Sequence, residues 1–167
     1  MKILITGYRG FIGQNMVKAL SADHELSVFE WGEPVPNIHG LDWVIHLGAI
    51  SSTTERDVER IMVQNYDFSC WLLDQCSING VNLQYASSAS IYGHNREFSE
   101  YSSPDPRSPY SWSKFLFDRH VSRLRPHFLK DFVVQGFRYF NVYGPEGEEH
   151  KGSQRSKEHT SELQSHL

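Results

Sequence analysis

The sequence has little cysteine, no long apolar run and no excess of basic charge, and each absence excludes a class of protein. The 167 residues include two cysteines, Cys70 and Cys76, whose spacing fits neither a disulfide framework nor a zinc site. The longest apolar stretch, 41–50, is interrupted by Asp42 and His46, and the N-terminal apolar run is too short for a secretion signal. Sixteen basic against twenty acidic residues give no cationic field for nucleic acid. We therefore expect a cytoplasmic protein with reduced thiols and no metal, membrane or nucleic-acid site.

Strand-like and helix-like segments alternate along the chain, which has the composition of one globular domain. Strands are predicted at 2–6, 26–29, 43–47, 83–86 and 132–140. Helices are predicted at 11–20, 52–77 and 110–125. An S-x-x-E capping box at 52–55 marks the start of the second helix, and Asn79-Gly80 ends it. This alternation predicts an α/β fold, a doubly wound parallel sheet with helices on both faces.

A glycine-rich turn joins the first strand to the first helix. Gly7, Gly10 and Gly13 form a G-x-x-G-x-x-G loop, in which the backbone can approach a pyrophosphate and meet it with free N–H groups. Glu30 ends the next predicted strand, where a carboxylate accepts hydrogen bonds from ribose hydroxyls and favours NAD. Arg9 lies in the loop itself, where a guanidinium pairs with a 2′-phosphate and favours NADP. The loop predicts a Rossmann-type dinucleotide site and leaves both cofactors open.

A second group of residues has the spacing of an acid/base site. Tyr110 and Lys114 lie four apart on a predicted helix, so their side chains share one face. Lowering a tyrosine pKa from about 10 to about 7 takes roughly 4 kcal/mol, which a nearby ammonium and an oxidised nicotinamide can supply. Ser88 follows a predicted strand at the sheet edge where ligands bind, and its hydroxyl can hydrogen-bond a substrate oxygen.

The blocks GYRGFIG, SSASIYG and YSWSK together resemble the extended short-chain dehydrogenases/reductases, the class of nucleotide-sugar epimerases and dehydratases. Further blocks, GAISSTTE, YSWSKFLFD, GFRYFNVYGP and HKGS, are similar to the subgroup that epimerises an ADP-glycero-manno-heptose at carbon 6. The resemblance covers most of 48–153. It implies transient oxidation and re-reduction of the sugar with NADP, or NAD, and a role in lipopolysaccharide core synthesis. It also implies an ADP-heptose substrate and a homo-oligomeric full-length form.

The resemblance also implies a role for each matching residue. Tyr110 matches the catalytic tyrosine, Lys114 the lysine that lowers its pKa, and Ser88 the serine that binds the reacting oxygen. Lys151 matches a second acid/base residue. Cofactor contacts are implied for Gly7, Arg9, Gly10, Phe11, Ile12, Gly13, Glu30, Leu47, Gly48, Ala49, Ser51, Asn65, Lys114 and Val142. Substrate contacts are implied for Ser88, Asn141 and Ser153.

The sequence departs from the family pattern in two places. Between Glu30 and Trp43 there is room for only a tight loop, where the family has another strand and helix. The chain also ends where the family continues into a C-terminal substrate domain. We expect a truncated dinucleotide-binding domain at 1–143 and the start of a substrate-site loop at 144–154. We expect a disordered tail at 155–167, which resembles the translation of a sequencing adaptor and is therefore taken as non-native.

Three readings of the function follow. The first is the ADP-heptose 6-epimerase reaction in a full-length protein, with this chain inactive by itself. The second is a 4-epimerase, dehydratase or reductase acting on another nucleotide sugar. The third is a non-catalytic NAD(P)-binding fragment, and a missing substrate domain predicts an exposed apolar sheet edge and self-association.

Overall fold

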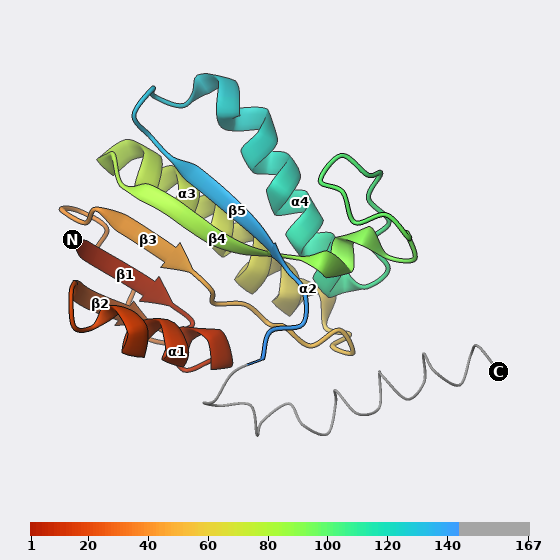
Figure 1. The fold of residues 1–167 in the computed structure, drawn as a ribbon, viewed down its shortest axis with the longest axis horizontal. Coiled ribbons are helices and arrows are strands. Elements are labelled where there is room, and N and C mark those ends of the chain that lie inside the picture. The colour runs from red at the N-terminus through yellow and green to blue at the C-terminus, as the bar shows by residue number, and fades with distance from the viewer. Residues whose placement is uncertain (144–167) are drawn as a thin grey trace.

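The computed structural model describes residues 1–143, which form a five-stranded sheet in the order β2-β1-β3-β4-β5 (Figure 1). The strands are β1 (Lys2–Thr6), β2 (Glu25–Phe29), β3 (Trp43–His46), β4 (Asn82–Ser88) and β5 (Val134–Tyr139). All four neighbouring pairs are parallel. The predicted doubly wound parallel sheet is therefore confirmed.

Helices cover both faces of the sheet, because successive residues of each central strand point to opposite sides. On one face, α1 (Phe11–Leu20) packs through Met16 and Val17 against Ile3 and Ile5 of β1. On the other face, α3 (Phe68–Asn79) and α4 (Pro109–Leu124) enclose the larger core. That core includes Leu4, Val44, Leu72, Leu73, Leu83 and Phe117. The central strands are buried on both sides, which explains their continuous apolar sequences.

The second helical segment differs from the prediction at its start. The Ser52 hydroxyl forms a local turn with Thr54, and the Glu55 carboxylate accepts the backbone N–H groups of Arg56 and Asp57. The helix begins instead at α2 (Val58–Ile61), where the Asp57 side chain accepts the Arg60 backbone N–H at 3.0 Å. Asp57 is the N-cap in place of the predicted Ser52, because the Ser52 hydroxyl and the Glu55 carboxylate are both engaged in the preceding turn.

The same segment is not a uniform α-helix. It continues from α2 through a π-helical stretch, η1 (Met62–Asp67), into α3, and ends at Gly80 with φ +67°, as predicted. A π-helical stretch changes the direction of the side chains that follow it and is frequent at functional sites. Here it contains Asn65.

The connection between β2 and β3 is a short loop, as the sequence indicated. Residues 30–42 contain no helix or strand, and Ile38 anchors the loop in the core. Within the described residues, β2 is therefore an edge strand. The other connections include the short helical turns η2 (Ala89–Tyr92) and η3 (Arg125–His127). Among residues 1–143, no helix has the length and apolar character needed to cross a membrane.

Candidate functional site

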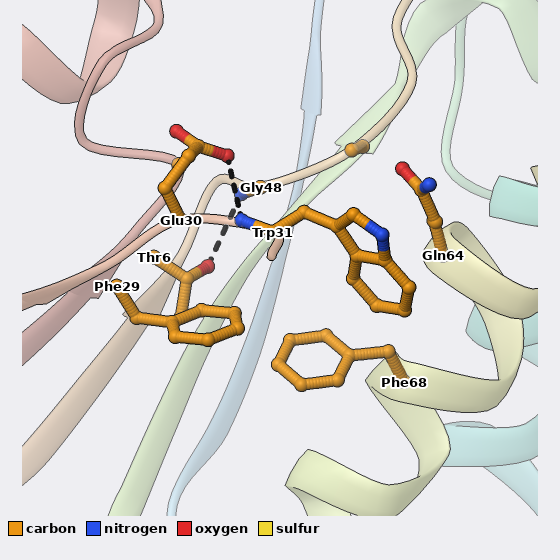
Figure 2. Close-up of a pocket in the computed structure, with 9 residues that line it drawn as sticks. Thr6, Phe29, Glu30, Trp31, Gly48, Gln64 and Phe68 are labelled. Carbon is orange, nitrogen blue, oxygen red and sulfur yellow. Dashed lines mark hydrogen bonds between the residues drawn. The ribbon is translucent and has the colours of Figure 1, made fainter. Parts of the chain in front are cut away.

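A crevice opens where the direction of winding changes. From β1 the chain passes through α1 to β2, whereas β3 pairs with the other side of β1, so the loops after β1 and β3 separate at this point. Ligands of doubly wound sheets bind at such positions. The pocket found there is shown in Figure 2. It is lined by Thr6, Gly7, Phe29, Glu30, Trp31, Gly48, Ala49, Gln64 and Phe68.

The glycine-rich loop has the backbone that a pyrophosphate site needs. Gly7 adopts φ +71°, and a Cβ there would lie 2.5 Å from the backbone nitrogen of Gly48, so the two loops meet only because this residue is glycine. Gly10 is the N-cap of α1 and has no side chain to satisfy the first-turn amides, which include those of Phe11 and Ile12. The first turn also contains no acidic residue. These residues fit an anionic group such as the pyrophosphate of a dinucleotide.

Aromatic rings form the apolar side of the pocket. The Phe68 ring from α3 stacks on Phe29 with centroids 5.3 Å apart, and the edge of Trp31 meets it at 5.7 Å. Figure 2 shows the three rings together beneath the loop that carries Glu30. A planar, largely apolar base fits against such a surface.

Asn65, on η1, fixes the loop after β3 through hydrogen bonds to its backbone. The Asn65 side chain accepts the Ile50 backbone N–H at 2.8 Å and donates to the Ile50 carbonyl at 3.0 Å and to the Ser113 hydroxyl at 3.1 Å. Asn65 is completely buried. Asn65 thus holds residues 47–51 in place through the backbone of Ile50, and its contact with the cofactor stays a prediction.

A buried chain of hydrogen bonds continues from Asn65 to the glycine-rich loop. The Ser69 hydroxyl donates to the Asn65 carbonyl at 2.5 Å, so it accepts from Nε2–H of His46 at 2.8 Å. The Nδ1 of a neutral His46 then accepts from the Thr6 hydroxyl at 2.6 Å, and Thr6 Oγ1 accepts the Gly48 N–H at 3.1 Å. Burial, and secondarily the charge of Lys114, lowers the pKa of His46 to about 3. His46 is thus held neutral in one tautomer.

Ser88, Tyr110 and Lys114 meet at the carboxyl end of β4. Ser88 Oγ accepts the N–H and hydroxyl of Ser90 at 3.2 and 2.9 Å, which leaves its own hydrogen for the phenol oxygen of Tyr110. Burial raises the pKa of Tyr110, and the Ser88 hydrogen bond acts in the opposite direction. The structure therefore brings two of the predicted catalytic residues, Tyr110 and Ser88, into hydrogen-bond contact.

Lys114 lies one turn after Tyr110 and is 5% exposed. Its Nζ donates to the Ala86 carbonyl at 2.9 Å. Burial lowers the pKa of Lys114 to about 8, and the charge of Asp118, one further turn along α4, raises it. With a pKa of about 8, Lys114 is mostly protonated at pH 7 but loses its proton more readily than an exposed lysine.

Asp118 is part of a polar group that the sequence reasoning did not identify. Its carboxylate accepts from the hydroxyls of Tyr85 at 3.0 Å and Ser87 at 2.9 Å, and from Arg138 Nε at 3.4 Å. Asp118 follows Lys114 by four residues, so helical periodicity alone could have indicated a common face. Its partners on β4 and β5 depend on the sheet order, which the local sequence does not give.

The remaining candidates lie at the same edge or outside the described residues. Asn141 and Val142 follow β5 and are exposed. Leu47, Gly48, Ala49 and Ser51 follow β3, which ends at His46, one residue before the predicted end of the strand. Lys151 and Ser153, together with the boundaries proposed at 144–154 and 155–167, lie outside the described residues. Within residues 1–143, no group of three or more His, Cys, Asp or Glu side chains is arranged to hold a metal ion.

A doubly wound sheet in which the tyrosine and lysine of one helix face a serine of the neighbouring strand has the architecture of the extended short-chain dehydrogenases/reductases. Within that class, the chain belongs to the NAD dependent epimerase/dehydratase family, whose model matches residues 30–162. A protein of Pseudomonas aeruginosa named ADP-L-glycero-D-manno-heptose-6-epimerase is 37% identical over 185 residues, covering 93% of this chain and 55% of the relative. The namesake from Thiobacillus denitrificans is 38% identical over 186 residues, covering 92% and 54%. The chain thus spans about half the length of these relatives.

Solved structures agree with this assignment. The Helicobacter pylori ADP-L-glycero-D-manno-heptose-6-epimerase superposes with a TM-score of 0.77 at 27% identity, covering 90% of this chain and 58% of that one. The Thermus thermophilus UDP-glucose 4-epimerase in complex with NAD gives a TM-score of 0.74 at 28% identity, with coverage of 90% and 58%. Nucleotide-sugar epimerases of different specificity therefore share this part of the fold.

Proposed function

We propose that this chain is the dinucleotide-binding part of an ADP-L-glycero-D-manno-heptose 6-epimerase. The observation that carries the proposal is the position of Tyr110 and Ser88, at the strand end beside a crevice suited to a dinucleotide. The names of the relatives at 37–38% identity favour ADP-heptose as the nucleotide sugar. The family resemblance further favours a cytoplasmic homo-oligomer in lipopolysaccharide core synthesis.

The proposed cofactor site extends along the crevice. The first-turn amides of α1 would bind the pyrophosphate, and Glu30 would accept hydrogen bonds from the adenosine ribose. The adenine would lie against Trp31 and Phe68, in place of contacts from the strand and helix that this chain lacks after β2. Val142, which follows β5, would contact the nicotinamide end of the cofactor.

A bound nicotinamide would supply the hydride acceptor and donor for a reaction with no net redox change. Tyr110 would exchange a proton with the sugar oxygen, and Ser88 would orient that oxygen through its hydroxyl. The Lys114 ammonium, which lies one turn after Tyr110 and donates to the Ala86 carbonyl in this structure, would stabilise the tyrosinate. Inversion requires an acid/base on the opposite face of the reacting carbon, and Lys151 remains our prediction for that role, with Asn141 and Ser153 as substrate contacts.

The test uses the reading frame that encodes this chain, expressed to its stop codon. Epimerisation of ADP-heptose would be followed by chromatographic separation of the two epimers. Tyr110→Phe is expected to lower kcat by roughly 10²–10⁴-fold because it removes the proton-transfer group. Tyr101→Phe removes the same hydroxyl from a side chain that is 96% exposed and serves as the control.

The outcomes separate the three readings. Turnover of a UDP-, GDP- or dTDP-sugar in place of ADP-heptose would favour the second reading, because the fold is shared among epimerases of different specificity. Binding of the dinucleotide with no turnover of any of these sugars would favour the third, a non-catalytic fragment. A Tyr110→Phe variant that epimerises at the original rate would overturn the assignment of the acid/base residue.

A further inference from the structure

Glu33 places a second carboxylate beside Glu30, at the pocket end proposed for the adenosine ribose. Its Oε2 accepts the backbone N–H of Glu30 at 2.8 Å. Its Oε1 accepts from Arg9 Nη2 at 2.7 Å and from the Tyr8 hydroxyl at 3.2 Å. Glu33 therefore binds directly to the one residue of the glycine-rich loop whose charge favours a 2′-phosphate.

The position of Glu33 is set by the backbone. The segment Glu30-Trp31-Gly32-Glu33 forms a turn in which the Glu33 N–H donates to the Glu30 carbonyl at 3.0 Å and Gly32 adopts φ +95°. A left-handed residue at the third position suits a glycine. The ion pair itself is solvent-exposed, with Arg9 and Glu33 side chains 65% and 30% exposed, so it would not fix the geometry alone. The turn holds the carboxylate in place, and Arg9 is attracted to it.

Several of the donors that could bind a phosphate here already have partners. Glu30 accepts the backbone N–H of Arg9 at 3.4 Å and that of Trp31 at 3.1 Å. The Arg9 guanidinium donates to Glu33 and, through Nε, to the Tyr8 hydroxyl at 3.0 Å. Two carboxylates therefore occupy the amides and the cation at this end of the crevice. Such a surface accepts hydrogen bonds from hydroxyl groups and repels a dianion.

We propose that Glu33 makes this site selective for NAD over NADP, by neutralising Arg9 so that the negative charge of Glu30 stays uncompensated beside the ribose 2′ position. The inference rests on the proposed dinucleotide function and adds the residue that decides between the two cofactors. Glu30 supplies the acceptor for the 2′-hydroxyl. Glu33 prevents Arg9 from serving as the receptor for a 2′-phosphate.

The test measures the dissociation constants of NAD⁺ and NADP⁺ for the 167-residue chain by isothermal titration calorimetry. The wild type is expected to bind NAD⁺ about tenfold or more tightly than NADP⁺. Glu33→Gln keeps an oxygen that can accept the Glu30 N–H, removes the charge and releases Arg9. It is expected to narrow the NAD⁺/NADP⁺ ratio by about tenfold or more. In the double variant R9Q/E33Q the gain in NADP⁺ affinity is expected to disappear, because the freed guanidinium is its source.

Glu25→Gln is the matched control, because it removes the same charge from the opposite end of β2 and should leave the ratio unchanged. A wild type that binds NADP⁺ as well as NAD⁺, or an E33Q ratio equal to that of the wild type, would overturn the inference and leave dinucleotide binding intact. A wild type that binds neither nucleotide would overturn the proposed function as well. Where E33Q does not fold, a wild type that binds NADP⁺ as well as NAD⁺ still overturns the inference.

Discussion

His46 shows how a single buried side chain connects the stability of this protein to its site. It is 2% exposed, and its two ring nitrogens join Thr6 below the glycine-rich loop to Ser69 on α3. A protonated ring would have to donate from both nitrogens, so the Thr6 hydroxyl would lose its acceptor at Nδ1. Protonating His46 in the folded state is therefore unfavourable, because it buries a charge and breaks the hydrogen bond from Thr6.

Acid should destabilise the chain through His46. The pKa of His46 is about 3 in the folded state and about 6.5 when unfolded, so the unfolded state binds the extra proton between these values. The contribution of the neutral His46 to the free energy of unfolding is fully present above about pH 6.5 and is lost as the pH falls toward 3. From pH 7 to pH 4 the loss from this group is on the order of 3 kcal/mol. Urea unfolding at pH 7, 5.5 and 4, followed by circular dichroism, measures it.

The variant His46→Gln cannot titrate, so its free energy of unfolding should fall less steeply between pH 7 and pH 4 than that of the wild type. His39→Gln removes an exposed histidine and should keep the wild-type slope. Parallel pH curves for H46Q and the wild type would show that His46 is not the linked group.

Among the elements, the π-helical stretch η1 holds the loop after β3, which forms one side of the crevice. It directs Asn65 inward, where one amide group bonds the loop after β3 and the helix that carries Tyr110. Ser113 completes this connection because its hydroxyl donates to the Tyr110 carbonyl at 2.7 Å. The loop after β3 and the helix that carries Tyr110 are thus positioned by the same side chain.

Replacing Asn65 with alanine should therefore destabilise the chain strongly. The backbone N–H and carbonyl of the half-buried Ile50 would lose their partners, which predicts a loss of about 3 kcal/mol in the free energy of unfolding. Chemical denaturation at pH 7 measures the change. Val63→Ala lies in the same stretch on an exposed position and should change stability by less than about 0.5 kcal/mol. Equal effects of the two variants would contradict the positioning role of Asn65.

The sequence predicted the elements well and their irregularities poorly. Strands and helices follow hydrophobic periodicity, so the five strands and the end of α3 at Gly80 could be predicted locally. The predicted helix start at residue 52 was wrong because the Glu55 carboxylate accepts backbone N–H groups in the turn before α2. The π-helical stretch was not predicted because six residues are too few to show a periodicity of their own. Glu33 and Asp118 were missed for another reason. Their partners come from elements brought together by the sheet order.

At the scale of the whole molecule, the sheet has two open edges within the described residues, at β2 and at β5. The β5 edge is the more apolar. Exposed large apolar side chains on and around β5 are Val133, Phe137, Phe140, Val142 and Tyr143. A strand with one unpaired edge and exposed apolar residues is a template for pairing with another chain.

We therefore expect the 167-residue chain to self-associate through β5. Light scattering after size-exclusion chromatography, at two concentrations about tenfold apart, should show a mass that rises with concentration. Phe137→Lys places a charge on the exposed edge, where Phe137 is 45% exposed, and should increase the monomer fraction. Ile78→Lys makes the same change on α3, where the side chain is 77% exposed, and should leave association unchanged. A wild type that stays monomeric at both concentrations and unfolds cooperatively would show that the β5 edge is protected. An F137K variant that associates as strongly as the wild type would show that the contact lies elsewhere.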